Sequence, residues 1–144
     1  MRRLALFLVS LCLALPAVAA DTARADRKEV FGNVTVHYSA FTSSMLTPQV
    51  AAATGLVRSK NLGVLTLTAL KAGKPATAVV SGTVKGLTER SNPLSFRQVT
   101  DQGTVSYVAQ FKIEQPETVT FDLNVETGGI GNSFSFNQEV FPGE

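Results

Sequence analysis

The stretch TVTFDLNVE, residues 118–126, alternates strictly between apolar and polar side chains. The apolar set is Val119, Phe121, Leu123 and Val125, and the polar set is Thr120, Asp122, Asn124 and Glu126. Successive side chains of an extended strand point to opposite faces, so a period of two is typical of a β-strand with one face buried and the other in water. The stretch therefore predicts a strand whose apolar face covers a core.

Similar stretches lie on both sides of this strand and are separated by turn residues. They are NVTVHYSAF (33–41), GVLTLTALK (63–71), TAVVSGTVKGL (77–87), LSFRQV (94–99), TVSYVAQFKI (104–113) and SFSFNQEVF (133–141). The turns include KAGKP (71–75), DQG (101–103) and TGGIGN (127–132). The seven expected strands fit an all-β fold, an antiparallel two-layer sandwich of immunoglobulin or fibronectin type. Tyr107 and Phe121 are then expected in the core on adjacent strands.

One segment, LTPQVAAATGL (46–56), interrupts the β pattern between the first two of these strands. Thr47 suits a helix N-cap, and Pro48 suits the first helical position because its missing N–H is not needed there. Gly55 suits the end of a helix, where a left-handed residue is common. The segment predicts a short helix over residues 48–54 that carries the chain from the first strand to the second.

The N-terminus has the three parts of a secretory signal peptide. Arg2 and Arg3 are followed by an apolar stretch over residues 4–15 and by small residues at 17–20, and the apolar stretch is too short to span a bilayer. We expect a signal peptide over residues 1–20, cleaved after Ala20, and a periplasmic mature protein. Residues 21–27 are then a flexible N-terminal segment, and residues 28–144 form a single β-sandwich domain.

Cleavage changes the charge and the cysteine content of the chain. The 13 basic and 11 acidic residues of the whole sequence become 11 and 11 once Arg2 and Arg3 leave, so the net charge falls from +2 to 0. Nucleic acid is therefore an unfavoured partner, because phosphate binding needs clustered cations. Cys12 leaves with the signal, so the mature chain has to fold without a disulfide.

The stretch Arg58, Ser59, Lys60 and Asn61 directly precedes the second expected strand and is the candidate site for a ligand or partner. Two cations beside an amide suit a carboxylate or a phosphate. A structural role is the alternative, in which Arg58 or Lys60 pairs with a carboxylate such as Asp122 or Glu126 on a neighbouring strand and Asn61 forms a turn before Gly63. The sequence leaves both interpretations open.

Catalytic, cofactor and metal sites are not predicted. His37 is the one histidine of the chain, and it has no carboxylate or second histidine nearby in sequence. Ser81 lies in an expected strand and not at a strand-to-helix elbow, which argues against a serine nucleophile. The glycines at 128–131 lead into a strand, so we interpret them as a hairpin loop and not as a phosphate-binding loop.

Four segments together resemble one bacterial family. VHYSAF (36–41), LTPQVAAATGL (46–56), RSKNLGVLTL (58–67) and QEVFPGE (138–144) are similar to the domain of unknown function 4426 family of small exported proteins. The similarity covers nearly all of the mature chain, and residues 58–61 are its most specific part. It implies an exported single domain but no activity, cofactor or catalytic residue.

Two functional hypotheses follow. The first is a non-catalytic periplasmic accessory or binding module, which recognises an unknown protein or small ligand through the crossover segment and adjacent loops. The second is an envelope structural or chaperone-like factor that pairs an edge strand with an extended client. A hydrolytic enzyme is the least favoured class. We expect a monomer without a transmembrane segment in the mature chain.

Overall fold

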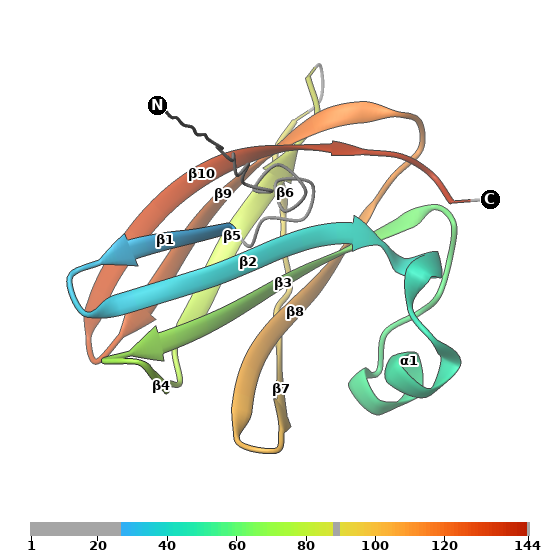
Figure 1. The fold of residues 1–144 in the computed structure, drawn as a ribbon. Coiled ribbons are helices and arrows are strands. Elements are labelled where there is room, and N and C mark those ends of the chain that lie inside the picture. The colour runs from blue at the N-terminus through green and yellow to red at the C-terminus, as the bar shows by residue number, and fades with distance from the viewer. Residues whose placement is uncertain (1–26, 88–89, 144) are drawn as a thin grey trace, which may run out of the picture.

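Two antiparallel β-sheets and a short helix form the residues that the computed structural model describes, 27–87 and 90–143 (Figure 1). The first sheet has the order β1 (Arg27–Phe31), β2 (Val34–Thr42), β3 (Leu62–Lys71), β8 (Thr104–Lys112) and β7 (Arg97–Asp101), with β4 (Lys74–Pro75) paired to β3. The second has the order β10 (Ile130–Val140), β9 (Glu117–Thr127), β5 (Val79–Lys85) and β6 (Asn92–Pro93). Between β2 and β3 lie the 3-10 helix η2 (Ser43–Met45) and the α-helix α1 (Pro48–Thr54). The predicted antiparallel β fold with a short helix is confirmed.

Strand β9 contains the stretch that suggested the fold, and its predicted alternation is confirmed. All four apolar side chains of the stretch are buried, and Phe121 is completely so, at 0% exposure. β9 pairs with β10 on one side and with β5 on the other, which places Phe121 opposite Phe136 and opposite Val84. This central position in its sheet explains why the pattern is so regular, since both backbone edges and one side-chain face are covered.

The core lies between the two sheets and is rich in aromatic rings. Phe121 of the second sheet contacts Phe111 of the first edge to face, with ring centroids 5.1 Å apart, and stacks on Phe136 at 4.9 Å. Tyr107 also lies in this core, but on β8 of the first sheet. The prediction that Tyr107 and Phe121 occupy adjacent strands is therefore wrong, because residues 113–116 carry the chain from one sheet to the other.

Strands β1 and β7 differ from what the sequence predicts. β1 was not predicted, yet it pairs along its length with β2, and Arg27 is its first residue. Of the expected flexible segment 21–27, residues 21–26 lie outside the described residues, as do the expected signal peptide and its cleavage site. The strand expected over 94–99 begins only at Arg97, because Leu94 is buried in the core and donates its N–H to the carbonyl of Gly82 in the other sheet.

Arg27 joins the adjacent edges of the two sheets. Its guanidinium donates to Gln138 Oε1 at 2.6 Å and to the carbonyl oxygen of Asn137 at 3.1 Å, both on β10. It also lies over the ring of Phe136, 5.0 Å from the centroid, and 5.7 Å from that of Tyr38. A planar cation suits both contacts, since it can stack on a ring and donate along its edge.

Tyr38 makes the stability of the protein depend on pH in the alkaline range. Burial, and secondly the nearby Glu29 carboxylate, raise the pKa of the Tyr38 phenol above its ordinary value, although Arg27 opposes them. The unfolded chain therefore releases this proton at a lower pH than the folded chain. We expect the free energy of unfolding to fall as the pH rises past about 10, and to fall less steeply in Tyr38→Phe. Urea unfolding at increasing alkaline pH measures both slopes, and equal slopes would contradict the assignment.

Helix α1 begins and ends as the sequence predicts. Thr47 Oγ1 accepts a hydrogen bond from the N–H of Val50 at 3.1 Å, Pro48 is the first residue, and Gly55 closes the helix with φ at +74°. Arg97 of β7 donates to the carbonyl oxygens of Thr54 and Gly55 at 3.1 and 3.2 Å, and so caps the C-terminal end. Such caps satisfy groups that a short helix cannot pair internally.

The segment that follows α1 is fastened to the outer face of the first sheet. The side-chain amide of Gln110 donates to the carbonyl oxygen of Val57 at 2.9 Å and accepts from its N–H at 3.1 Å. Val64 and Val108 are buried although they are not part of the core between the sheets, because their side chains point to this outer face. The crossover therefore covers part of a face that would otherwise be exposed.

Candidate functional site

The four residues predicted as a contact site lie in the connection from α1 to β3. Arg58, Lys60 and Asn61 are exposed, and Ser59 is half-buried. Figure 1 shows this connection rising from α1 at one end of the sheets, on the same side as the C-terminus. We call this part of the molecule the crossover end, and define it as residues 58–62, 110–114 and 141–143.

Hydrogen bonds to the backbone fix the position of this connection. Ser43 is completely buried, and its Oγ donates to the carbonyl oxygen of Ser59 and accepts from the Ser59 N–H, both at 2.9 Å. The carbonyl oxygens of Lys60 and Asn61 accept from the N–H groups of Gly143 and Ile113, both at 2.8 Å. Residues 58–61 are therefore held by three separate parts of the chain, and their side chains project from a fixed backbone.

The structural interpretation of these residues is correct in one part and wrong in another. Asn61 donates its N–H to Ser59 Oγ at 3.1 Å, which forms the expected turn before β3. Asp122 and Glu126, however, lie on β9 in the second sheet, whereas the full-length neighbours of β3 are β2 and β8. Asp122 instead accepts a hydrogen bond from Ser135 Oγ on β10. The two carboxylates are thus not on a strand that neighbours the two cations.

Two adjoining clefts open at the crossover end. One has a volume of about 450 Å³ and is lined by Ser59, Asn61, Leu62, Lys112 and Glu114. The other has a volume of about 430 Å³ and is lined by Val84, Gly86, Asn92, Pro93, Leu94, Gln110, Phe111, Lys112, Glu114, Glu117 and Val119. Lys112 and Glu114 line both clefts. Of the predicted site, Ser59 and Asn61 line the first cleft, whereas neither cleft is lined by Arg58 or Lys60.

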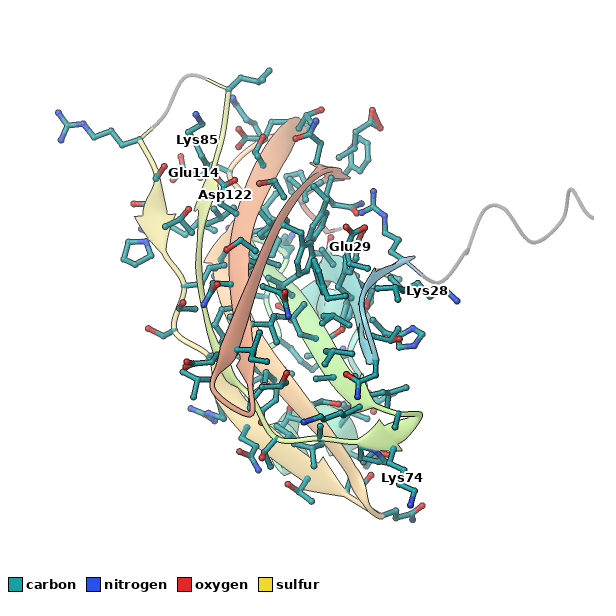
Figure 2. The ribbon with its side chains drawn as sticks, turned by 90° about the vertical axis from the view of Figure 1, so that its left-hand side faces the viewer. Lys28, Glu29, Lys74, Lys85, Glu114 and Asp122 are labelled. Carbon is teal, nitrogen blue, oxygen red and sulfur yellow. The ribbon has the colours of Figure 1, made fainter. Side chains whose placement is uncertain are left out.

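The second cleft has an apolar floor and a polar rim. Its floor consists of side chains that also belong to the core, namely Val84, Leu94, Phe111 and Val119. Lys112 and Glu114 are exposed at the rim, so a bound group would meet both signs of charge. In Figure 2, Lys85 and Glu114 lie toward one end of the molecule and Lys74 toward the opposite end. An apolar floor with a few convergent polar groups is the usual composition of a binding cleft.

Other residues considered from the sequence lie elsewhere. His37 is on β2, opposite Lys28 of β1 and Thr68 of β3, and is half-buried. Among the described residues, no group of three or more His, Cys, Asp or Glu side chains is placed to hold a metal ion. Ser81 is exposed on β5, and Gly128 and Gly129 form the tight turn between β9 and β10 with φ at +58° and +84°. The interpretation of these glycines as a hairpin loop is confirmed.

The helices that the structure describes are all too short or too polar to cross a lipid bilayer.

Several solved structures are similar to this chain. A DUF4426 family protein from Pseudomonas aeruginosa is 46% identical, with a TM-score of 0.76, and the match covers 83% of this chain and 97% of that one. A copper-bound variant of FetP from uropathogenic Escherichia coli is 12% identical with a TM-score of 0.59, and covers 80% of this chain and 94% of its own.

FetP as isolated, expressed recombinantly in the periplasm of Escherichia coli, is 10% identical with a TM-score of 0.59, over 83% of this chain and 95% of its own. At these identities the likeness to FetP concerns the fold alone. No curated protein matches the chain. The model of the family described as a domain of unknown function, DUF4426, matches residues 28–143, as the resemblance implied. The chain therefore belongs to the DUF4426 family.

Proposed function

We propose that the protein is a non-catalytic, immunoglobulin-like binding module of the periplasm, and that its ligand or partner binds at the crossover end. The observation that carries the proposal is the pair of adjoining clefts that share Lys112 and Glu114. They bring part of the predicted contact stretch, Ser59 and Asn61, next to an apolar floor. Loops held on a rigid pair of sheets are where such folds usually make their contacts.

The fixed backbone of the crossover end supports binding to a preformed surface. The two bonds between Ser43 and Ser59 are buried, and the bonds from Ile113 and Gly143 hold the following two residues. A surface that is already ordered loses little conformational entropy when a ligand binds. Ligand specificity can then come from the rim, where Lys112 and Glu114 carry opposite charges.

The residues around the clefts favour binding over catalysis. Ser59 Oγ accepts the N–H of Asn61, and His37 is on β2 outside the residues that line either cleft. A serine nucleophile needs a base within hydrogen-bond reach, and the lining residues supply no histidine for that role. The signal peptide predicted over residues 1–20 supports a periplasmic location.

Site-specific crosslinking in intact cells tests this function. A photoreactive amino acid replaces Lys60 in the full chain, and in a matched strain it replaces Lys74, which is also exposed and lies at the opposite end (Figure 2). We expect a discrete crosslinked product from position 60 and none from position 74. A product from both positions in equal yield, or from neither, would contradict binding at the crossover end.

The two exposed cations are tested by changing Arg58 and Lys60 together to Gln. Both side chains are exposed, so we expect little change in melting temperature. If they contact the partner, capture weakens at low salt and becomes less sensitive to added salt. The control changes Lys71 and Lys74 to Gln, which removes the same charge from exposed positions elsewhere. Capture that is unchanged at low salt would assign the contact to the clefts and not to the two cations.

A further inference from the structure

Strand β8 lies between β3 and β7 in the first sheet, and it extends beyond the end of β7. In the part of the chain that the structure describes, the pairing of β7 with β8 ends at Arg97 opposite Val108, whereas β8 continues to Lys112. Residues 94–96 turn away toward β6, which pairs with β5 in the other sheet. Residues 109–112 of β8 therefore have no paired strand among the described residues on the side away from β3, and this open edge lies next to the clefts of the crossover end.

The direction of the backbone groups along this edge follows from the hairpin that joins β7 and β8. Its two-residue turn, Gln102 and Gly103, closes on the pair Asp101 and Thr104. In such a hairpin the closing pair is hydrogen-bonded, and every second residue repeats this orientation. The even-numbered residues of β8 therefore direct N–H and C=O toward β7. The N–H of the odd-numbered Ile113 accordingly points the other way and donates to Asn61 before β3.

Gln110 and Lys112 thus direct their backbone N–H and C=O groups outward at the open edge, where the β7 ladder no longer covers them. Both residues also line the cleft of about 430 Å³, together with Phe111 between them. A strand paired to this edge would place the side chain opposite Phe111 on the same face as Phe111. That face looks into the apolar floor formed by Val84, Leu94 and Val119.

We propose that β8 accepts an extended segment of a partner polypeptide as an added strand along residues 109–113. The partner segment carries a large apolar side chain opposite Phe111, which enters the cleft, and an acidic side chain opposite Lys112. The backbone groups of Gln110 and Lys112 bond to its main chain, as in other cases of strand addition. This inference rests on the proposed function and names the class of partner that the crossover end binds.

An extended polypeptide fits this edge better than a small molecule does. The backbone groups of Gln110 and Lys112 offer two N–H donors and two C=O acceptors at the spacing of a β-ladder. Another strand matches this spacing, whereas a compact ligand does not. The interface also continues the existing β7–β8 ladder beyond the pair Arg97 and Val108, so an added strand would meet the same edge of β8 that β7 meets. Opposite charges paired across two strands are favourable, and the exposed Lys112 selects an acidic residue at its position.

Amide hydrogen exchange with a synthetic peptide tests the proposal on the unmodified mature protein. The probe is acetyl-Val-Glu-Phe-Thr-Val-amide, in which Phe lies opposite Phe111 and Glu opposite Lys112. In the free protein we expect the amides of Gln110 and Lys112 to exchange much faster than those of Phe111 and Ile113. Saturating peptide should slow the two fast amides by at least about tenfold, since each gains a hydrogen bond.

Two control peptides separate strand addition from nonspecific adsorption. One carries N-methyl groups at Glu and Thr, which removes the donors that face β8, and the other replaces Phe by Asp. Neither should protect Gln110 or Lys112. Equal protection by the N-methylated peptide, or protection of β1 or β10 in place of β8, would overturn the proposal. So would a failure of the unmodified peptide to protect the two amides at millimolar concentration.

The substitution Lys112→Pro blocks the edge from the protein side. The N–H of Lys112 points away from β3, so proline removes a donor from the open edge without removing one from the existing ladder. We expect peptide affinity to fall on the order of tenfold or more, whereas Lys112→Gln, which keeps the N–H, should lose less. If Lys112→Pro does not fold, the N-methylated peptide on the unmodified protein still decides the question.

The outcome for strand addition can be distinguished from that for the proposed function. A partner that is crosslinked through position 60 and still captured by Lys112→Pro would retain the binding module and reject strand addition. The absence of any crosslinked product from position 60 of the otherwise unmodified protein would reject the binding module, whether or not the peptide protects the two amides. Protection of Gln110 and Lys112 that appears without peptide and grows with protein concentration would identify a second copy as the occupant and overturn the proposal.

Discussion

Phe121→Ala is expected to lower the free energy of unfolding by about 3 to 5 kcal/mol, the usual cost of removing a buried aromatic ring. Phe121 is completely buried and contacts Phe111 across the core at 5.1 Å and Phe136 within its own sheet at 4.9 Å. Alanine would leave a cavity between two sheets that are fixed by their own hydrogen-bond ladders, so the surroundings can collapse only partly. Urea unfolding of the mature protein measures the difference.

The matched control for this change is Phe141→Ala, which removes the same atoms from a side chain that is 56% exposed. We expect it to alter stability far less than Phe121→Ala does. If Phe121→Ala lowered the free energy of unfolding by less than about 1 kcal/mol, the position would behave like a surface position. The face of β9 that contains Phe121 would then not be the face buried in the core.

Gly63→Ala is expected to destabilise the protein by about 1 to 3 kcal/mol, because it overfills a packed site. Gly63 on β3 is paired with Phe111 on β8, and the Phe111 ring lies over the glycine. A Cβ at position 63 would overlap three ring atoms of Phe111, which is itself only 5% exposed and has little room to move. The cost is steric, since the backbone at Gly63 is ordinary extended chain.

A double variant identifies the Phe111 ring as the cause. Phe111→Leu by itself also destabilises the core, but in its presence Gly63→Ala should cost clearly less than it does alone, because the overlapping ring is gone. Gly131→Ala serves as a control, since a Cβ on that exposed strand residue would meet Asn124 only at an ordinary contact distance of 3.4 Å. Additive effects of the two core changes would contradict the contact.

Local features of the structure were predictable where the sequence contains the whole signal. The strict alternation in β9 requires only that one face be buried, and the caps of α1 involve Thr47, Pro48 and Gly55 within nine residues. Strand β1 was missed because RKEVF has no clear alternation, and Val30 within it is 61% exposed. Its extended conformation depends on pairing with β2, which is a tertiary property.

The assignment of strands to sheets could not be derived from alternation. Tyr107 and Phe121 have the same pattern and are separated by one short connection, yet they lie in opposite sheets. A period of two specifies which face of a strand is apolar, but it does not specify which other strands pair with that strand. The late start of β7 has the same origin, because Leu94 crosses between the sheets and enters the core.

The sequence by itself determined the antiparallel β fold, the helix with both of its ends, and the position of Arg58 to Asn61 directly before the second expected strand. Only the tertiary structure decided that Ser59 and Asn61 share a cleft with Lys112 and Glu114. It also decided that β8 extends beyond the end of β7 and leaves an open edge beside the apolar floor of the cleft. The reason is physical: these features depend on the order and relative lengths of strands that are far apart in the chain, and local side-chain patterns record neither.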